Sequence, residues 1–104
     1  MPDVHFERQY RTPYSEGYFI MEEQGRLGKI DLHFTPTVVY ATMIVEREMA
    51  EDELLDLIEQ ADDELVLSAD VARDDFLVSV FQGKDLGVYS DEYFEEAEED
   101  EDNP

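Results

Sequence analysis

The sequence predicts an α+β fold, a mainly antiparallel sheet of five to seven strands with one amphipathic helix packed on one of its faces. Three observations support this fold class. Several short segments are rich in β-branched and aromatic residues, and one longer segment has the 3.6-residue period of an amphipathic helix. Most connections between the expected strands are short and contain Gly or Pro, which is typical of hairpins.

The first part of the chain predicts three strands separated by turns. In the first of them, Val4, Phe6 and Tyr10 are expected on one face and the intervening polar residues on the other. In the third, the even-numbered positions are apolar and the odd-numbered positions polar, so one face is expected inward. The expected strands are residues 4–10, 18–22 and 29–34, and the expected turns are residues 11–17, 24–28 and 35–37.

Residues 38–45 predict the central strand of the sheet. Apolar side chains fall on both alternating sets of positions in VVYATMIV, so both faces of this strand are expected to be covered. One helix covers only one face of a sheet. The other face of this strand therefore needs a different cover, and we expect self-association as a homodimer.

An amphipathic helix follows the central strand. Its apolar residues recur at steps of three and four, and they are Leu54, Leu57, Ile58, Ala61 and Leu65. The helix is expected to begin near Met49, which has no side-chain oxygen with which to cap it. Acidic residues fill the first turn, where they interact favourably with the positive end of the helix dipole.

The second part of the chain predicts further strands and an acidic tail. Residues 64–71 are expected to form a strand, and residues 76–81 and 86–89 a hairpin joined by residues 82–85. We expect a single domain over residues 1–92. Residues 93–104 are expected to form a disordered acidic tail, because they are dominated by carboxylates and carry no base.

The charge is large and unevenly distributed. The chain has 29 acidic and 7 basic residues, a net charge of −22. Residues 1–49 hold eight acids and five bases, a net charge of −3, whereas residues 50–104 hold 21 acids and two bases, a net charge of −19. A solvated surface or adaptation to a high-salt cell would explain acidic residues spread over the whole surface. An uneven distribution equally indicates a local acidic face, which would attract basic partners.

Several classes of function lack the residues that they need. The chain has no cysteine, which excludes disulfides, thiol catalysis and thiolate metal sites. It has no apolar run of membrane-spanning length and no signal-peptide pattern, so we expect a cytoplasmic protein. Nucleophile, phosphate-loop and zinc-protease motifs are absent, and no cofactor is expected. Direct nucleic-acid binding is disfavoured, because it requires clustered Lys and Arg.

The candidates for a metal site are few. Asp31 and His33 lie on one face of an expected strand, and their ligand types suit several divalent metals. A third ligand such as Glu22 or Glu23 is not fixed by the spacing. The alternative is that all of these are ordinary surface residues. The acids around the helix lack the spacing and central glycine of an EF-hand loop, so a solvated helix face is the better interpretation.

The sequence therefore predicts a small, non-enzymatic interaction module, an adaptor or regulator that docks on a basic surface of a partner protein. Two alternatives remain open at this point. In one, the carboxylates mimic nucleic-acid phosphates and inhibit a DNA- or RNA-binding protein, and in the other the chain is an enzyme or a metal-binding domain. The residues expected to contact the basic partner lie on the polar face of the helix, and they are Glu51, Asp52, Asp56, Glu59 and Asp63.

Overall fold

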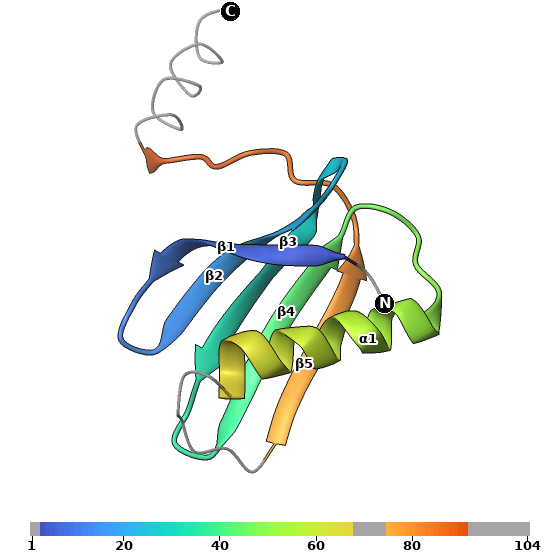
Figure 1. Ribbon diagram of the computed structural model, residues 1–104. Coiled ribbons are helices and arrows are strands. Elements are labelled where there is room, and N and C mark those ends of the chain that lie inside the picture. The colour runs from blue at the N-terminus through green and yellow to red at the C-terminus, as the bar shows by residue number, and fades with distance from the viewer. Residues whose placement is uncertain (1–2, 68–74, 92–104) are drawn as a thin grey trace, which may run out of the picture.

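Five strands and one helix make up the described part of the chain, residues 3–67 and 75–91 of the computed structural model (Figure 1). The sheet order is β1-β2-β3-β4-β5, with β4 and β5 parallel and all other neighbours antiparallel. The predicted fold class is confirmed. The elements in chain order are β1 (Val4–Arg11), β2 (Ser15–Glu22), β3 (Gly25–Phe34), β4 (Val38–Val45), α1 (Glu51–Ala61), the π-helical segment η1 (Asp62–Val66) and β5 (Asp75–Gln82).

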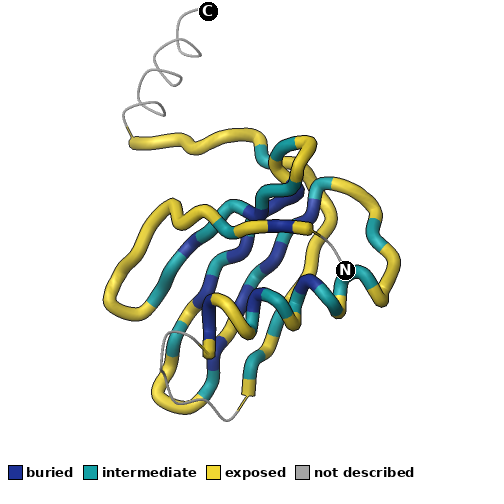
Figure 2. The backbone as a smooth tube through the Cα atoms, viewed as in Figure 1, coloured by how far each residue is buried: buried dark blue, intermediate teal, exposed yellow. Residues whose placement is uncertain are grey.

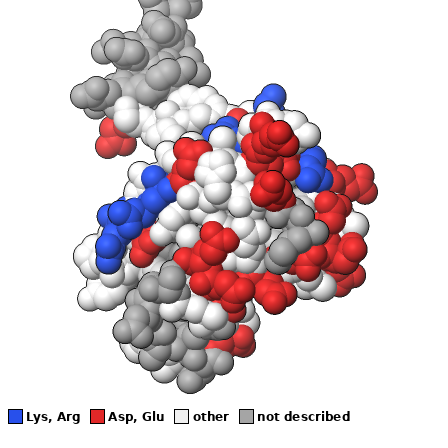
Figure 3. Space-filling view, in the orientation of Figure 1, with Lys and Arg blue, Asp and Glu red and all other residues white. Residues whose placement is uncertain are grey.

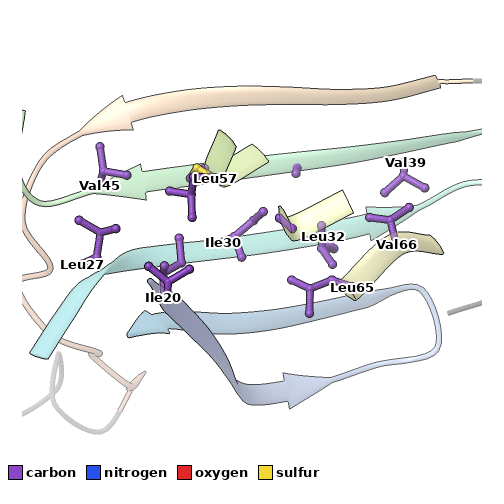
Figure 4. Close-up of a cluster of buried hydrophobic side chains, with 13 residues drawn as sticks. Ile20, Leu27, Ile30, Leu32, Val39, Val45, Leu57, Leu65 and Val66 are labelled. Atoms are coloured by element: carbon purple, nitrogen blue, oxygen red, sulfur yellow. The ribbon is translucent and has the colours of Figure 1, made fainter. Parts of the chain in front are cut away.

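The core lies between the sheet and the helix. In β4, the odd-numbered residues Val39, Ala41, Met43 and Val45 are buried beneath the helix. Figure 4 shows how they meet side chains from β2, β3, α1 and η1, and Figure 2 shows the buried positions along the backbone. The apolar stripe predicted for the helix is confirmed, since its five residues all belong to this core or pack against it.

The opposite face of the sheet has no helix among the described residues. We call this the open face. Tyr40 of β4 is 49% exposed there, and the alternation of the strand places Thr42 and Ile44 beside it. β4 is an interior strand, paired with β3 and β5, but the middle strand of the sheet is β3 and not β4 as predicted. Only one of the two apolar faces of β4 is covered by the helix.

β1 curls across the helix-covered side of the sheet (Figure 1). The Gln60 side-chain amide in α1 donates a hydrogen bond of 3.0 Å to the backbone carbonyl of Val4, which joins the first strand to the helix. The pairing of β1 with β2 shifts between Arg8 and Tyr10. Such a bulge bends a strand and reverses which face the following residues occupy.

The bulge makes one prediction wrong. Tyr10 was expected on the same face as Val4 and Phe6, but it lies on the open face, opposite Gly17. There its hydroxyl donates a hydrogen bond of 2.7 Å to Asp31. Simple alternation fails because the extra residue of a bulge has no signature in the apolar pattern.

The turn between β2 and β3, predicted at residues 24–28, is shorter than predicted. β3 begins at Gly25, so residues 25–28 are part of the strand and not of the turn. Gly25 has a φ of +131°, which favours glycine, whereas Gly28 does not have a positive φ. Position 28 instead requires glycine because there is no room for a side chain: a Cβ there would collide with the backbone carbonyl of Ile44 on β4.

Residues 64–67 do not begin a strand. Glu64, Leu65 and Val66 belong to η1, which continues α1, and residues 68–71 lie outside the described residues. Leu65 and Val66 are both buried although they are adjacent. Adjacent residues can both pack on the core because they lie only about 100° apart round a helix, as Leu57 and Ile58 do in α1.

The predicted hairpin of residues 76–81 and 86–89 is also wrong. β5 pairs in parallel with β4, and residues 86–89 form no strand. The amide of Gly83 donates to the carbonyl of Val45, so pairing with β4 continues where a turn was expected. Leu86 and Val88 are 82% and 98% exposed. The apolar β4 thus replaces residues 86–89 as the partner of β5.

Two further expectations concern the ends of the chain and membranes. The predicted acidic tail, residues 93–104, lies outside the described residues. The one-domain boundary at residue 92 stays a prediction. No helix in the described part of the chain is both long and apolar enough to span a membrane.

The close approach of β3 to β4 predicts that Gly28→Ala destabilises the fold. A methyl group would have to displace the Ile44 carbonyl from the strand pairing, and overpacking of this kind costs about 1–3 kcal/mol. Urea unfolding measures the loss. The matched control is Gly83→Ala, because nothing lies within 4 Å of a Cβ at Gly83 and its φ is not positive. Equal stability of the two variants would contradict the close approach.

Candidate functional site

The candidate site is the outward surface of α1. The helix begins one residue later than expected, with Ala50 rather than Met49 at the N-cap. Alanine has no side-chain acceptor. However, the Glu53 carboxylate accepts a hydrogen bond of 3.3 Å from the Ala50 amide, so a side chain of the helix itself binds this backbone donor at the helix start. Glu51, Asp52 and Glu53 occupy the first turn, where the helix dipole favours them.

The predicted partner-binding residues lie together on this helix and its π-helical extension. Asp52, Asp56, Glu59 and Asp63 follow one another at steps of four, three and four residues, which places them on one stripe opposite the buried Leu57 and Ala61. All of the predicted residues are exposed except Asp56, which is half-buried. We call Glu51, Asp52, Asp56, Glu59 and Asp63 the acidic helix face.

No base neutralises the acidic helix face within the described residues. None of its carboxylates lies within 4.0 Å of a Lys, Arg or His nitrogen there. Arg47, in the loop before the helix, pairs with Glu22 at 3.4 Å and with Glu53 at 3.8 Å. Figure 3 shows Asp and Glu side chains over the region of α1 and the few bases mostly toward the edge of the view.

An exposed leucine lies among these acids, and sequence reasoning missed it. Leu55 is 58% exposed and is spaced four residues from both Glu51 and Glu59. Adjacent Leu54 packs against the core. The signal was present in the sequence, since Leu55 lies about 100° round the helix from Leu54, on the side away from Leu57 and so outside the core stripe. The site therefore combines unpaired carboxylates with an exposed apolar side chain beside them.

The structure separates the residues proposed for a metal site. Asp31 and His33 lie on the open face of β3, as their spacing predicted. The register places Ser15 opposite His33 and Gly25 opposite Glu22, so Glu22 lies at the far end of β2. Glu22 is seven residues along β2 from Ser15, which places it about 23 Å from the position opposite His33. In the described part of the chain, no group of three His, Cys, Asp or Glu residues is arranged to hold a metal ion.

Asp31 instead organises a polar cluster on the open face. It accepts the hydrogen bond from the Tyr10 hydroxyl and lies 3.3 Å from the Lys29 ammonium. A groove of about 280 Å³ adjoins the cluster, between the sheet and the segment that contains Asp85 and Val88. The Tyr10 hydroxyl, the Asp31 carboxylate and the Lys29 ammonium therefore bind one another.

Comparison with family models, with curated proteins and with solved structures finds no match to this chain. Function is therefore inferred from the chemistry of its own surfaces. Two surfaces are available in the described residues, the acidic helix face and the open face with its adjoining sheet edge. They differ, because the first carries unpaired acids whereas the second combines paired polar groups such as Asp31 and Lys29 with exposed apolar side chains.

The Tyr10–Asp31 contact predicts an alkaline transition. Burial, the hydrogen bond to Asp31 and the charge of that carboxylate together raise the pKa of Tyr10 from 10.0 to about 12. The folded state thus holds this proton more tightly than the unfolded state. The resulting stability is complete below pH 10 and is lost as the pH rises from 10 towards 12. The difference in tyrosinate absorbance between wild type and Tyr10→Phe isolates this ionisation.

Asp31→Asn provides the control for this assignment. The variant removes the negative charge but leaves the ring partly covered, so the midpoint of the Tyr10 step should move part of the way back towards 10. An unchanged midpoint in Asp31→Asn would contradict the contribution of the carboxylate.

Proposed function

We propose that this protein is a non-enzymatic interaction module, an adaptor or regulator that docks on a basic surface of a partner protein through the acidic helix face. One observation supports this most directly. The five carboxylates have no basic neighbour within 4.0 Å among the described residues, and the exposed Leu55 lies beside them. Protein interfaces commonly combine polar groups with apolar side chains.

The electrostatic cost of this arrangement favours a binding role. Like charges spaced three or four residues apart on a helix repel each other by a few tenths of a kcal/mol for each pair. Bases at the same spacing would remove that cost, yet α1 contains none. A basic partner surface would supply the missing charges from outside. It would also accelerate association, because a one-sided field attracts partners of the opposite sign.

The alternative of nucleic-acid mimicry receives less support from the helix. A mimic of a duplex needs two rows of carboxylates, one for each phosphate backbone. The residues Asp52, Asp56, Glu59 and Asp63 form one row, and the exposed position beside it is occupied by Leu55. An apolar side chain has no counterpart on a phosphate backbone. Docking on a basic protein surface is therefore the better proposal.

Reversing two charges tests the proposed function. Asp56→Lys with Glu59→Lys should preserve the fold and reduce the recovery of partner proteins from lysate by about tenfold or more, chiefly through slower association. The effect should be largest at low salt, because screening weakens attraction between exposed charges. Recovered proteins are compared by mass spectrometry, and circular dichroism confirms that the variant is folded.

The matched control places the same charge change elsewhere. Glu23→Lys with Asp91→Lys alters two exposed acids that make no ion pair among the described residues and belong to segments other than α1. This control should recover partners as the wild type does. Equal losses in both double variants would show that net charge alone matters, and would refute a docking face on α1. Release of the partner by added duplex DNA would favour mimicry instead.

A further inference from the structure

β5 is the edge of the sheet and lacks the usual protection of an edge strand. Within the described residues it pairs only with β4. Residues 76–82, FLVSVFQ, contain no charge, proline or glycine, although the chain as a whole has a net charge of −22. Soluble proteins normally protect such an edge with charged residues, proline or a bulge, because its free backbone groups pair with other chains.

One hydrogen bond shows which residues of β5 direct their backbone amides and carbonyls away from the sheet. The Gly83 amide donates to Val45 on β4. Because backbone groups alternate in direction along a strand, odd-numbered residues of β5 point their amides and carbonyls towards β4. The even-numbered residues Val78, Val80 and Gln82 therefore direct theirs away from the sheet. Phe76 has the same parity, but its amide already donates a hydrogen bond of 2.8 Å to the Asp75 carboxylate.

We propose that two copies of the chain pair antiparallel through β5, joining two five-stranded sheets into one continuous sheet. A two-fold axis perpendicular to the sheet keeps both helices on the same side. Paired residues must then share a face, so the two residue numbers of each pair add to an even number. With the axis at Ser79, Val78 lies opposite Val80 of the second copy, and Leu77 lies opposite Phe81 of the second copy.

The charges at the two ends of β5 favour this antiparallel register. Asp75 begins the strand and Lys84 follows it, and neither has an ion pair among the described residues. The proposed register places Asp75 opposite Gly83 of the second copy, next to that copy's Lys84. Opposite charges therefore meet at both ends of the paired strands, whereas a parallel arrangement would bring like charges together.

The side chains beside the edge supply apolar area to the same interface. Leu77 and Phe81 are 45% and 56% exposed on the open face, and Val80 is 36% exposed on the helix side. A stable interface hides about 800 Å² on each partner. Backbone pairing along one short strand provides only part of this area. Contact across the axis between these exposed side chains would add the buried area that a stable dimer needs beyond the backbone pairing.

This inference is independent of the proposed function and has the opposite salt dependence. The two copies bring together two strongly acidic chains, so added salt should strengthen the dimer by screening repulsion. Added salt should instead weaken capture of a basic partner. Asp56→Lys with Glu59→Lys should reduce capture of the partner as stated above but leave the dimer intact or tighter. Failure of one proposal is thus distinguishable from failure of the other.

A single cysteine tests the register. Ser79 faces its own counterpart across the axis as a non-hydrogen-bonded pair, in which the Cα atoms lie about 4.5 Å apart. That separation is within the range of a disulfide. The chain has no cysteine of its own, so Ser79→Cys introduces the only thiol. Under mild oxidation this variant should become predominantly a covalent dimer on a non-reducing gel.

Thr42→Cys is the matched control, because Thr42 pairs with Ser79 on the same face but one strand further from the axis. In the proposed dimer its two copies lie three strand spacings apart, about 14 Å, beyond the reach of a disulfide. Wild type in analytical ultracentrifugation should shift from monomer towards dimer as concentration and salt increase. A monomer at all concentrations and salts, or equal cross-linking of the two cysteine variants, would overturn the proposal.

Discussion

β4 is apolar on both faces, and the described part of the chain contains one long helix with which to cover them. The arrangement of the whole molecule depends on this constraint. α1 covers the face that carries Val39 and Met43, so the strands on either side present their apolar residues to the same layer. The other face retains Tyr40 at about half exposure. That imbalance produces the two kinds of surface from which a function can be inferred.

Local patterns were sufficient to predict much of the fold. Alternation in residues 29–34 and the 3.6-residue period after Met49 each specify which side chains face the core, and both were confirmed by burial. The errors arose where a neighbour distant in sequence decides the outcome. β5 pairs with β4, 37 residues earlier, and not with residues 86–89. No local pattern distinguishes these partners, because both offer apolar positions at strand spacing.

Irregular backbone accounts for the remaining errors. The bulge between Arg8 and Tyr10 inserts a residue into the alternation of β1, and η1 continues helical backbone where a strand was predicted from residue 64. An inserted residue changes which face the following side chains occupy, and periodicity cannot detect it in advance. The bulge in particular brings Tyr10 to Asp31 and commits that carboxylate to a hydrogen bond.

The acidic helix face could be identified from sequence because helical spacing alone puts its residues on one stripe. The edge of the sheet could not, because recognising an edge requires the strand order. With both surfaces known, the question is whether so acidic a helix is compatible with an uncharged edge that pairs with a second copy.

Distance and screening answer that question. A helix with its side chains is about 10–12 Å thick, so the outward carboxylates of α1 lie about that far from the sheet beneath them. The Debye length is about 8 Å at physiological ionic strength and about 30 Å at 0.01 M salt. Under physiological conditions the acidic helix face therefore lies beyond one screening length from β5, and the two surfaces act independently. In dilute buffer they are coupled, and the charge that attracts a basic partner opposes the approach of a second copy.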